Sequence, residues 1–356
     1  MADVRPFRAV RYARPSAEVT APPYDVIDTE ACDALRARDP HNVVHLTSET
    51  DERAAAERLE RWLVDGTLFR DATPAVWFLE QDFVGPDGVA RRRDGIVASL
   101  RVEPYTADVV LPHERTHAEA LAGRLRLLRA TRAQLEPIFL LYEGAPPLAR
   151  PSTEPEVDID GTRLWRVEGD EGVEAFFRPR QLLIADGHHR YEAAVAFAAE
   201  DGADRMLVVL VSTDDPGLQV FPTHRVFAGR PEIDPTGDVY PTVPDARAAL
   251  DAEPRDSPAA VFVGSGGAPR LVRGEPGELD VELVDRLGLE GISYTPDADE
   301  ALRRVGSGVA DCAFLLRPLR IADVFDRARQ GRTMPPKATY FFPKLLSGLL
   351  LHPLEP

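Results

Sequence analysis

The chain has 356 residues, of which 44% are hydrophobic and 28% charged, the balance of a globular protein with two domains or one large domain. Its 59 acidic residues outnumber its 42 basic residues, and the formal net charge is −17. An acidic field repels phosphate backbones and anionic headgroups, so we expect no general nucleic-acid or membrane-surface partner. This charge still leaves room for one local basic pocket.

Lysine is almost absent from the chain. Only Lys337 and Lys344 stand among the 42 basic residues, and all the others are arginines. Two lysines in one short segment of such a chain indicate positions where a compact ammonium group is preferred to a guanidinium fork. We therefore expect both lysines to lie in the cationic pocket.

Cysteine usage and hydropathy indicate the compartment. Cys32 and Cys312 form neither a CxxC pair nor a disulfide framework, so a reducing cytoplasm is the expected location. The first residues lack the apolar core of a signal peptide, and no apolar run has the length of a membrane span. The oligomeric state does not follow from the sequence.

Hydrophobic periodicity and turn residues predict an α+β protein in chain order. The first part has expected strands at 7–12, 43–46, 75–83 and 96–102, and expected helices at 29–38 and 51–64. The second has expected strands at 109–111, 137–142, 181–185 and 206–212, and expected helices at 118–133 and 190–199. Residues 215–277 are expected to be loop-rich, with helices at 299–305 and 321–329 around a strand at 313–316. These elements predict three regions, 1–104, 105–215 with an insertion at about 143–177, and 216–356.

The segment LLIADGHHRYEAA runs from a buried strand through Asp-Gly into a helix. This places Gly187, His188, His189 and Arg190 at a helix N-terminus, where free backbone N–H groups and the helix dipole favour an anion. The glycine permits close backbone approach, and Arg190 can bind phosphate oxygens in a bidentate manner. The segment predicts an anion site, although a plain strand–helix junction would have the same pattern.

A second segment, LPHERTH, contains the pattern H-E-x-x-H at His113, Glu114 and His117, and Glu136 would be a third zinc ligand. A zinc hydrolase needs this motif inside a helix, whereas Pro112 places it in a turn or at a helix start. Two other interpretations remain open. Glu114 is either a carboxylate base beside the anion site or a capping residue of the first helical turn.

The succession of these segments resembles the ParB/sulfiredoxin-like fold, most closely its branch of free-serine kinases, over about residues 105–215. The whole chain also resembles a bacterial and archaeal family of unknown function once labelled "SpoOJ regulator". That resemblance rests on PPYDVI, HExTH, ADGHHRYE, a THR segment and a closing MPxKxTYFxPK, all present here. It implies an α+β fold with a ParB/sulfiredoxin-like nucleotide-binding core, an N-terminal α+β extension and a C-terminal α/β extension.

The resemblance implies a cytoplasmic kinase that transfers phosphate from ATP or ADP to free L-serine, with Mg²⁺ bound through the phosphates and Asp186 as a candidate ligand. The catalytic residues would be Glu114 as base, Asp186 and His189. The phosphate-binding residues would be Gly187, His188, His189, Arg190, Lys337 and Lys344, and the substrate-binding residues His113, Thr116, His117, His224, Arg225, Tyr24 and Asp25.

Two departures limit the choice of function. A sulfiredoxin needs a reactive cysteine in the phosphate turn, where this chain has histidines. A ParB clamp needs a helix-turn-helix module and a basic face, which the charge of −17 opposes. The alternatives are a nucleotide-binding regulatory protein without phosphotransfer and, more remotely, the zinc hydrolase.

Overall fold

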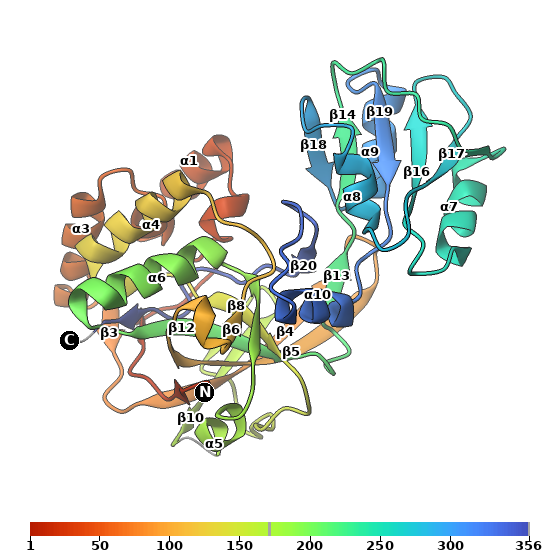
Figure 1. Ribbon diagram of the computed structural model, residues 1–356. Coiled ribbons are helices and arrows are strands. Elements are labelled where there is room, and N and C mark those ends of the chain that lie inside the picture. The colour runs from red at the N-terminus through yellow and green to blue at the C-terminus, as the bar shows by residue number, and fades with distance from the viewer. Residues whose placement is uncertain (170–171, 355–356) are drawn as a thin grey trace.

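The computed structural model describes residues 1–169 and 172–354, and a nine-stranded mixed sheet forms the centre of its larger domain (Figure 1). The strands follow the order β6-β11-β8-β12-β5-β4-β10-β9, and β1 pairs with β5. They are β1 (Val4–Arg5), β4 (Ala75–Val84), β5 (Ala90–Arg101), β6 (Val110–Leu111), β8 (Ile138–Tyr142), β9 (Val157–Ile159), β10 (Thr162–Glu168), β11 (Leu182–Asp186) and β12 (Arg205–Ser212). The β6–β11 and β8–β12 pairs are parallel, and the remaining pairs are antiparallel.

The sheet joins segments that are far apart in the sequence. Strands β8 and β12 are continuous apolar runs whose interiors are fully buried, as expected for strands covered on both faces. Strands β4 and β5 form a hairpin around the turn at 86–88, and β5 continues the sheet beside β12. The strands of residues 1–104 and those of residues 105–215 therefore share one sheet.

Helices α1 (Thr29–Arg38), α3 (Glu52–Val64), α4 (Ala118–Thr131) and α6 (His188–Asp201) lie over one side of this sheet (Figure 1). Helix α4 packs against both α3 and α6. The helical segments are η1 (Tyr24–Val26), α1 (Thr29–Arg38), α2 (Val44–Thr47), α3 (Glu52–Val64), η2 (Tyr105–Ala107), α4 (Ala118–Thr131), α5 (Val173–Phe177) and α6 (His188–Asp201). A two-stranded sheet of β2 (Val10–Tyr12) and β3 (Leu68–Arg70) adjoins them. In the described part of the chain, none of the helices is both long and apolar enough to cross a membrane.

A smaller domain contains an antiparallel six-stranded sheet in the order β15-β17-β16-β19-β14-β18. Its strands are β14 (His224–Phe227), β15 (Asp238–Val239), β16 (Ala259–Gly264), β17 (Arg270–Arg273), β18 (Ile292–Thr295) and β19 (Cys312–Leu315). Its helices are α7 (Val243–Ala252), α8 (Asp280–Asp285) and α9 (Ala298–Gly306). The expectation of a loop-rich segment at 215–277 is therefore wrong. The proline and glycine residues of this segment separate short strands and a helix, and several of these strands are buried.

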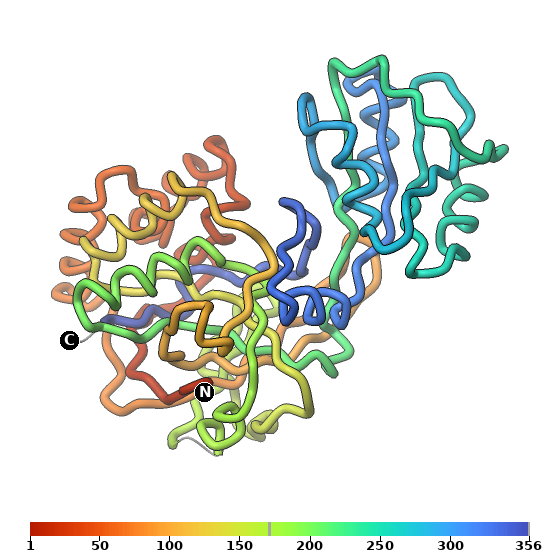
Figure 2. Tube along the Cα trace, in the orientation of Figure 1, coloured from red at the N-terminus to blue at the C-terminus, as the bar shows by residue number. Residues whose placement is uncertain are grey.

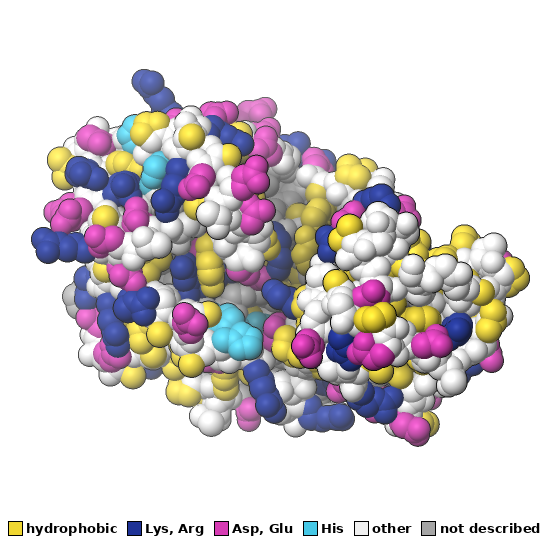
Figure 3. Space-filling model, turned by 90° about the horizontal axis from the view of Figure 1, so that it is seen from above, with side chains coloured by type: hydrophobic (Ala, Val, Ile, Leu, Met, Phe, Trp, Pro, Cys, Tyr) yellow, Lys and Arg dark blue, Asp and Glu magenta, His cyan; other side chains and the backbone are white. Residues whose placement is uncertain are grey.

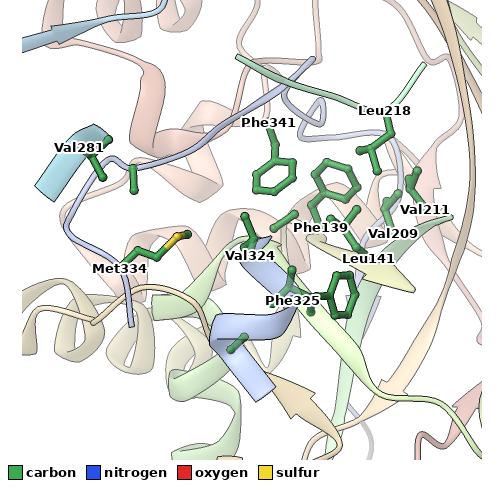
Figure 4. Packing of buried hydrophobic residues seen from close by; sticks show 14 of the residues in the cluster. Phe139, Leu141, Val209, Val211, Leu218, Val281, Val324, Phe325, Met334 and Phe341 are labelled. Carbon is green, nitrogen blue, oxygen red and sulfur yellow. The ribbon is translucent and has the colours of Figure 1, made fainter. Parts of the chain in front are cut away.

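The last part of the chain returns to the larger domain (Figure 2). After α10 (Ile321–Arg329), strand β20 (Tyr340–Phe342) pairs with β13 (Gln219–Phe221), and β21 (His352–Pro353) pairs with β7 (Ala133–Gln134). Figure 4 shows the cluster that this return completes: Phe341 of β20 packs beside Phe139 of β8, with Phe325 of α10 and Val281 of α8 in the same cluster. One hydrophobic cluster thus connects the large sheet, the closing segment and the smaller domain.

Two local expectations also differ from the structure. Residues 43–46 were expected as a strand, but Val44–Thr47 is a helical turn that starts after Asn42. The buried Asn42 side chain accepts from the Val44 N–H and donates to the carbonyls of Glu18 and Thr20, which favours the helical start over an extended strand. The surface insertion at about 143–177 contributes β9 and β10 to the sheet, while residues 170–171 within it lie outside the described residues.

Candidate functional site

A sharp turn connects β11 to α6 at the centre of the site. Gly187 has φ +100°, and a Cβ atom there would lie 2.5 Å from Ile138 Cγ2, so only glycine fits the turn. Gly187 is also the N-cap of α6, and no side chain in the described residues caps this helix. The first backbone N–H groups of α6 are therefore available to an anion, as the sequence predicts.

Three charged side chains lie together at this turn. Asp186 accepts a hydrogen bond from Lys344 Nζ at Oδ1 and one of 2.8 Å from Arg190 at Oδ2. Burial alone would raise the pKa of Asp186, but the charges of Lys344 and Arg190 outweigh it and lower that pKa. Burial likewise tends to lower the pKa of Lys344, and the charge of Asp186 raises it above its ordinary value. All three groups are therefore ionised at neutral pH and together carry one positive charge.

Arg190 is held below the turn. Its guanidinium is 8% exposed and donates 2.6 Å to the Pro137 carbonyl and 2.8 Å to Asp186. Its Nε atom is buried without a hydrogen-bond partner among the described residues. Arg190 thus supplies a fixed positive charge that is preorganised by the strand edge beside it.

The LPHERTH segment is bound to the start of α6 by three hydrogen bonds. The backbone N–H of His113 donates 3.3 Å to His188 Nε2, and the N–H of His117 donates 2.9 Å to His189 Nε2. Thr116 Oγ1 also donates 2.7 Å to Glu192 Oε2 on α6. The two motifs found separately in the sequence therefore form one unit, with Glu114 between the two histidine contacts.

These contacts define the protonation of the buried histidines. His188 accepts at Nε2, so its proton is on Nδ1, while His113 donates from Nδ1 to the Ile184 carbonyl over 2.6 Å and accepts at Nε2 from Thr339 Oγ1 over 3.1 Å. Burial lowers the pKa of His113 to about 4 and lowers that of His188 well below its ordinary value. Both rings are neutral at physiological pH, so their observed role is to position the two segments.

His189 and His117 lie closer to the surface. Their rings stack with centroids 6.0 Å apart, and burial followed by the charge of His117 lowers the pKa of His189. Because His189 Nε2 already accepts the His117 N–H, this nitrogen is not free to take a proton from a substrate. A group of histidine side chains is exposed near the smaller domain in Figure 3.

Glu114 has the environment of a titrating carboxyl group. Its backbone lies in a bridge with Met334 of the closing segment. Burial raises the pKa of Glu114, only partly opposed by the charge and backbone N–H of Lys337. The charge of Asp186 adds to the rise in the pKa of Glu114, and the charge of Lys344 opposes it.

The two lysines of the closing segment have different environments. Lys344 contacts Asp186, whereas Lys337 is exposed and its charge acts on Glu114 and His189. The Lys337 backbone has φ +56°, a left-handed conformation that is uncommon for residues other than glycine. The closing segment therefore presents one partly buried ammonium group, paired with Asp186, and one exposed ammonium group.

Tyr24 and Asp25 border the same turn. The Tyr24 ring lies 3.8 Å from the guanidinium of Arg124, and the Tyr24 N–H donates 3.1 Å to Glu136. Asp25 is exposed, and its charge acts on Arg190, Lys344 and His189. The N-terminal loop thus forms one rim of the site.

His224 and Arg225 do not offer free groups to a substrate here, which corrects the expectation from sequence. His224 lies on a separate hollow of about 520 Å³ that Arg247 also lines, and its Nδ1 accepts the Leu316 N–H over 3.1 Å. The Arg225 guanidinium is fully buried and is paired with Asp285. The Asp285 carboxylate and backbone carbonyls occupy the guanidinium N–H groups, so Arg225 has a structural role.

The zinc interpretation does not agree with the geometry. Residues 112–117 are not helical, His113 is hydrogen-bonded at both ring nitrogens, and His117 faces His189. Glu136 accepts instead from Ser347 Oγ over 2.7 Å and from Tyr24. Within residues 1–169 and 172–354, no cluster of three or more His, Cys, Asp or Glu side chains is arranged to hold a metal ion.

Sequence reasoning missed several residues of the site. Thr339 orients His113, Glu192 binds Thr116, and the Pro137 carbonyl holds Arg190. Glu192 and Thr339 lie within the ADGHHRYE and MPxKxTYFxPK motifs, but the motifs do not indicate their partners. The Thr339–His113 contact joins positions 226 residues apart, which no local spacing could reveal.

Comparison with known proteins places the chain in a family. No curated protein matches it. Among solved structures it is similar to a conserved hypothetical protein from Pyrococcus furiosus (18% identity, TM-score 0.36, covering 66% of this chain and 87% of that one). It is also similar to a free serine kinase in complex with AMP, with 18% identity and a TM-score of 0.42, over 72% of this chain and 92% of that one. A third similar structure is SbnI with a C-terminal truncation from Staphylococcus aureus, with 14% identity and a TM-score of 0.41, over 70% of this chain and 85% of that one. The family described as "Protein of unknown function (DUF1015)" matches residues 4–237, and the chain belongs to this family.

Proposed function

We propose that the protein is a phosphotransferase that moves a phosphoryl group from ATP or ADP to the hydroxyl of a small metabolite, with free L-serine as the leading acceptor. The observation that carries this proposal is the pairing of two environments. A buried, permanently charged group at an uncapped helix start lies beside a carboxyl group whose pKa is raised. Phosphoryl transfer depends mainly on such positioning and charge stabilisation.

The donor side is the turn at the start of α6. The free N–H groups of its first turn would bind phosphate oxygens, assisted by the fixed charges of Lys344 and Arg190. Because Asp186 neutralises one of these charges, the turn carries a single excess positive charge and can release its product. Gly187 lets the phosphates approach the backbone closely.

The acceptor side contains Glu114. In its ionised form this carboxylate would accept the proton of the acceptor hydroxyl as that oxygen forms its bond to the transferred phosphorus. The bond from phosphorus to the bridging oxygen of the donor breaks, and the shortened nucleotide leaves. Burial raises the pKa of Glu114 toward neutrality, which makes the carboxylate a stronger base than an exposed glutamate.

Among the described residues, no cluster of His, Cys, Asp or Glu side chains is arranged to hold magnesium. Both carboxylate oxygens of Asp186 already accept hydrogen bonds from Lys344 and Arg190, so Asp186 does not fit as a ligand. A magnesium ion would enter with the nucleotide phosphates, and no step is assigned to an ion held by the protein.

Serine is proposed as the acceptor because the Pro-His-Glu and Asp-Gly-His-His-Arg segments resemble those of free-serine kinases. The test is incubation of the purified protein with γ-labelled ATP or β-labelled ADP and a panel of amino acids and hydroxy acids, with Mg²⁺. O-phosphoserine that forms only with serine supports the proposal. Tight nucleotide binding without transfer to any acceptor would contradict it and would indicate the regulatory protein instead.

A further inference from the structure

The smaller domain reaches the proposed site through Tyr294 of β18. Burial raises the pKa of Tyr294, the charge of Arg225 opposes this rise, and the charges of Asp285 and Glu114 add to it. Tyr294 is thus a side chain of the smaller domain whose hydroxyl lies within the electrostatic reach of the proposed base. At neutral pH this hydroxyl keeps its proton and can donate a hydrogen bond.

Arg225 connects Tyr294 to the closing segment. Its guanidinium lies 5.2 Å from the Tyr294 ring centroid and is fully buried. It pairs with Asp285, with Nε 3.1 Å from Oδ1, and donates 3.1 Å to the Lys337 carbonyl. The buried Arg225 guanidinium therefore contacts both the Tyr294 ring and the backbone of the exposed Lys337.

Charged and polar groups of both domains interact electrostatically with Glu114. The charged turn with Asp186 and Lys344 belongs to the larger domain, whereas Tyr294 belongs to the smaller one. The exposed ammonium of Lys337 also acts on Glu114. A hydroxyl group and an ammonium group can together bind an anionic group of a substrate. The hydroxyl of the same substrate would then lie at the carboxylate base.

We propose that Tyr294 and Lys337 recognise the carboxylate of a small hydroxy acid or hydroxy amino acid whose hydroxyl lies at Glu114, so that the smaller domain selects the acceptor. This inference rests on the proposed phosphotransfer and adds the chemical class of the acceptor and the residue that distinguishes it. The nucleotide side stays within the larger domain and does not use Tyr294.

The test uses Tyr294→Phe, which removes one hydroxyl and keeps the ring that faces Arg225. Tyr240→Phe is the matched control, because Tyr240 belongs to the same domain and packs on the hydrophobic cluster under α7. The KM for serine should rise about tenfold in the first variant and stay unchanged in the control, while the KM for the nucleotide stays the same in both.

A second readout separates recognition from general damage. Wild-type protein should prefer serine to serinamide, which lacks the carboxylate, and Tyr294→Phe should reduce this preference by a similar factor. Equal preference in wild type and variant, or an unchanged KM for serine in Tyr294→Phe, would overturn the inference while phosphotransfer itself stands. If wild-type protein transfers phosphate to no hydroxyl compound, the inference falls together with the proposed function.

Discussion

The charged groups on the two sides of the site differ in whether they stay ionised. At the turn of α6, the buried Arg190 and the partly buried Asp186 and Lys344 are paired, and their mutual attraction keeps all three ionised. Across the site, Glu114 is partly buried with a raised pKa, and its neighbour Lys337 is exposed. One side is built to hold fixed charges and the other to change its charge.

The buried histidines of the site do not supply its positive charge. His113 and His188 are neutral and use their ring nitrogens to connect the two sides. A positive charge on either ring would be buried beside Lys344, at a high electrostatic cost. The positive potential of the turn therefore comes from Lys344, Arg190 and the helix dipole.

The largest stability effect is expected for Lys344→Met. Removing one member of the buried group leaves Asp186 with a single cation, and we expect a loss of roughly 3 kcal/mol in the free energy of unfolding. Nucleotide affinity should fall at least tenfold, because a fixed charge at the helix start is lost. Urea unfolding and isothermal titration with ATP and ADP measure the two effects.

The matched control is Lys337→Met, which removes the exposed ammonium of the same segment. Its free energy of unfolding should stay within about 0.5 kcal/mol of wild type, since surface substitutions rarely do more. Equal destabilisation by both substitutions would show that the two lysines do not differ in the way described.

A smaller effect is expected from pH on the neutral histidines. In the folded protein the pKa of His113 is about 4, against an ordinary value of 6.5. The unfolded chain therefore binds more protons between these values, and stability is lost as the pH falls from about 6.5 toward 4. The full difference corresponds to about 3 kcal/mol, of which part is lost by pH 5. Urea unfolding at pH 7 and pH 5 measures the loss, and a shallower pH dependence in His113→Gln assigns it. An identical pH dependence in the variant would place the loss elsewhere.

The smallest effect is expected for Thr116→Val, which removes the hydrogen bond to Glu192. The free energy of unfolding should fall by about 1 kcal/mol. Turnover should also fall several-fold, because the segment that carries Glu114 is held less firmly, while nucleotide affinity stays unchanged. Thr50→Val, at an exposed position before α3, serves as control. A variant with normal turnover would remove Thr116 from the positioning unit.

The sequence predicted the local parts of the site well. The expected strand–turn–helix around Gly187 and the expected helix after His117 are both present, because strong apolar runs and a glycine turn determine local structure. Lysine scarcity also led to the prediction that Lys337 and Lys344 lie at the site, which stays a prediction.

The remaining errors have a common physical cause. Arg225 was expected at the substrate, but Asp285, which pairs with it, lies 60 residues away, and no spacing pattern encodes such a contact. The neutrality of His188 likewise depends on burial against His113, which only the folded chain creates. Sequence patterns thus indicate which residue types have chemical potential, whereas tertiary contacts decide which of them are already engaged.

The central claim is that the site separates fixed charge from titrating charge. The measurement that tests it most directly is the single-turnover rate of phosphoryl transfer by Glu114→Gln with saturating nucleotide and serine. The account predicts a rate lower by about 10² or more, with wild-type nucleotide affinity and a melting temperature equal to or above that of wild type, because a destabilised carboxylate has been removed. A transfer rate close to that of wild type would contradict the assignment of Glu114 as the base and, with it, the proposed division of the site.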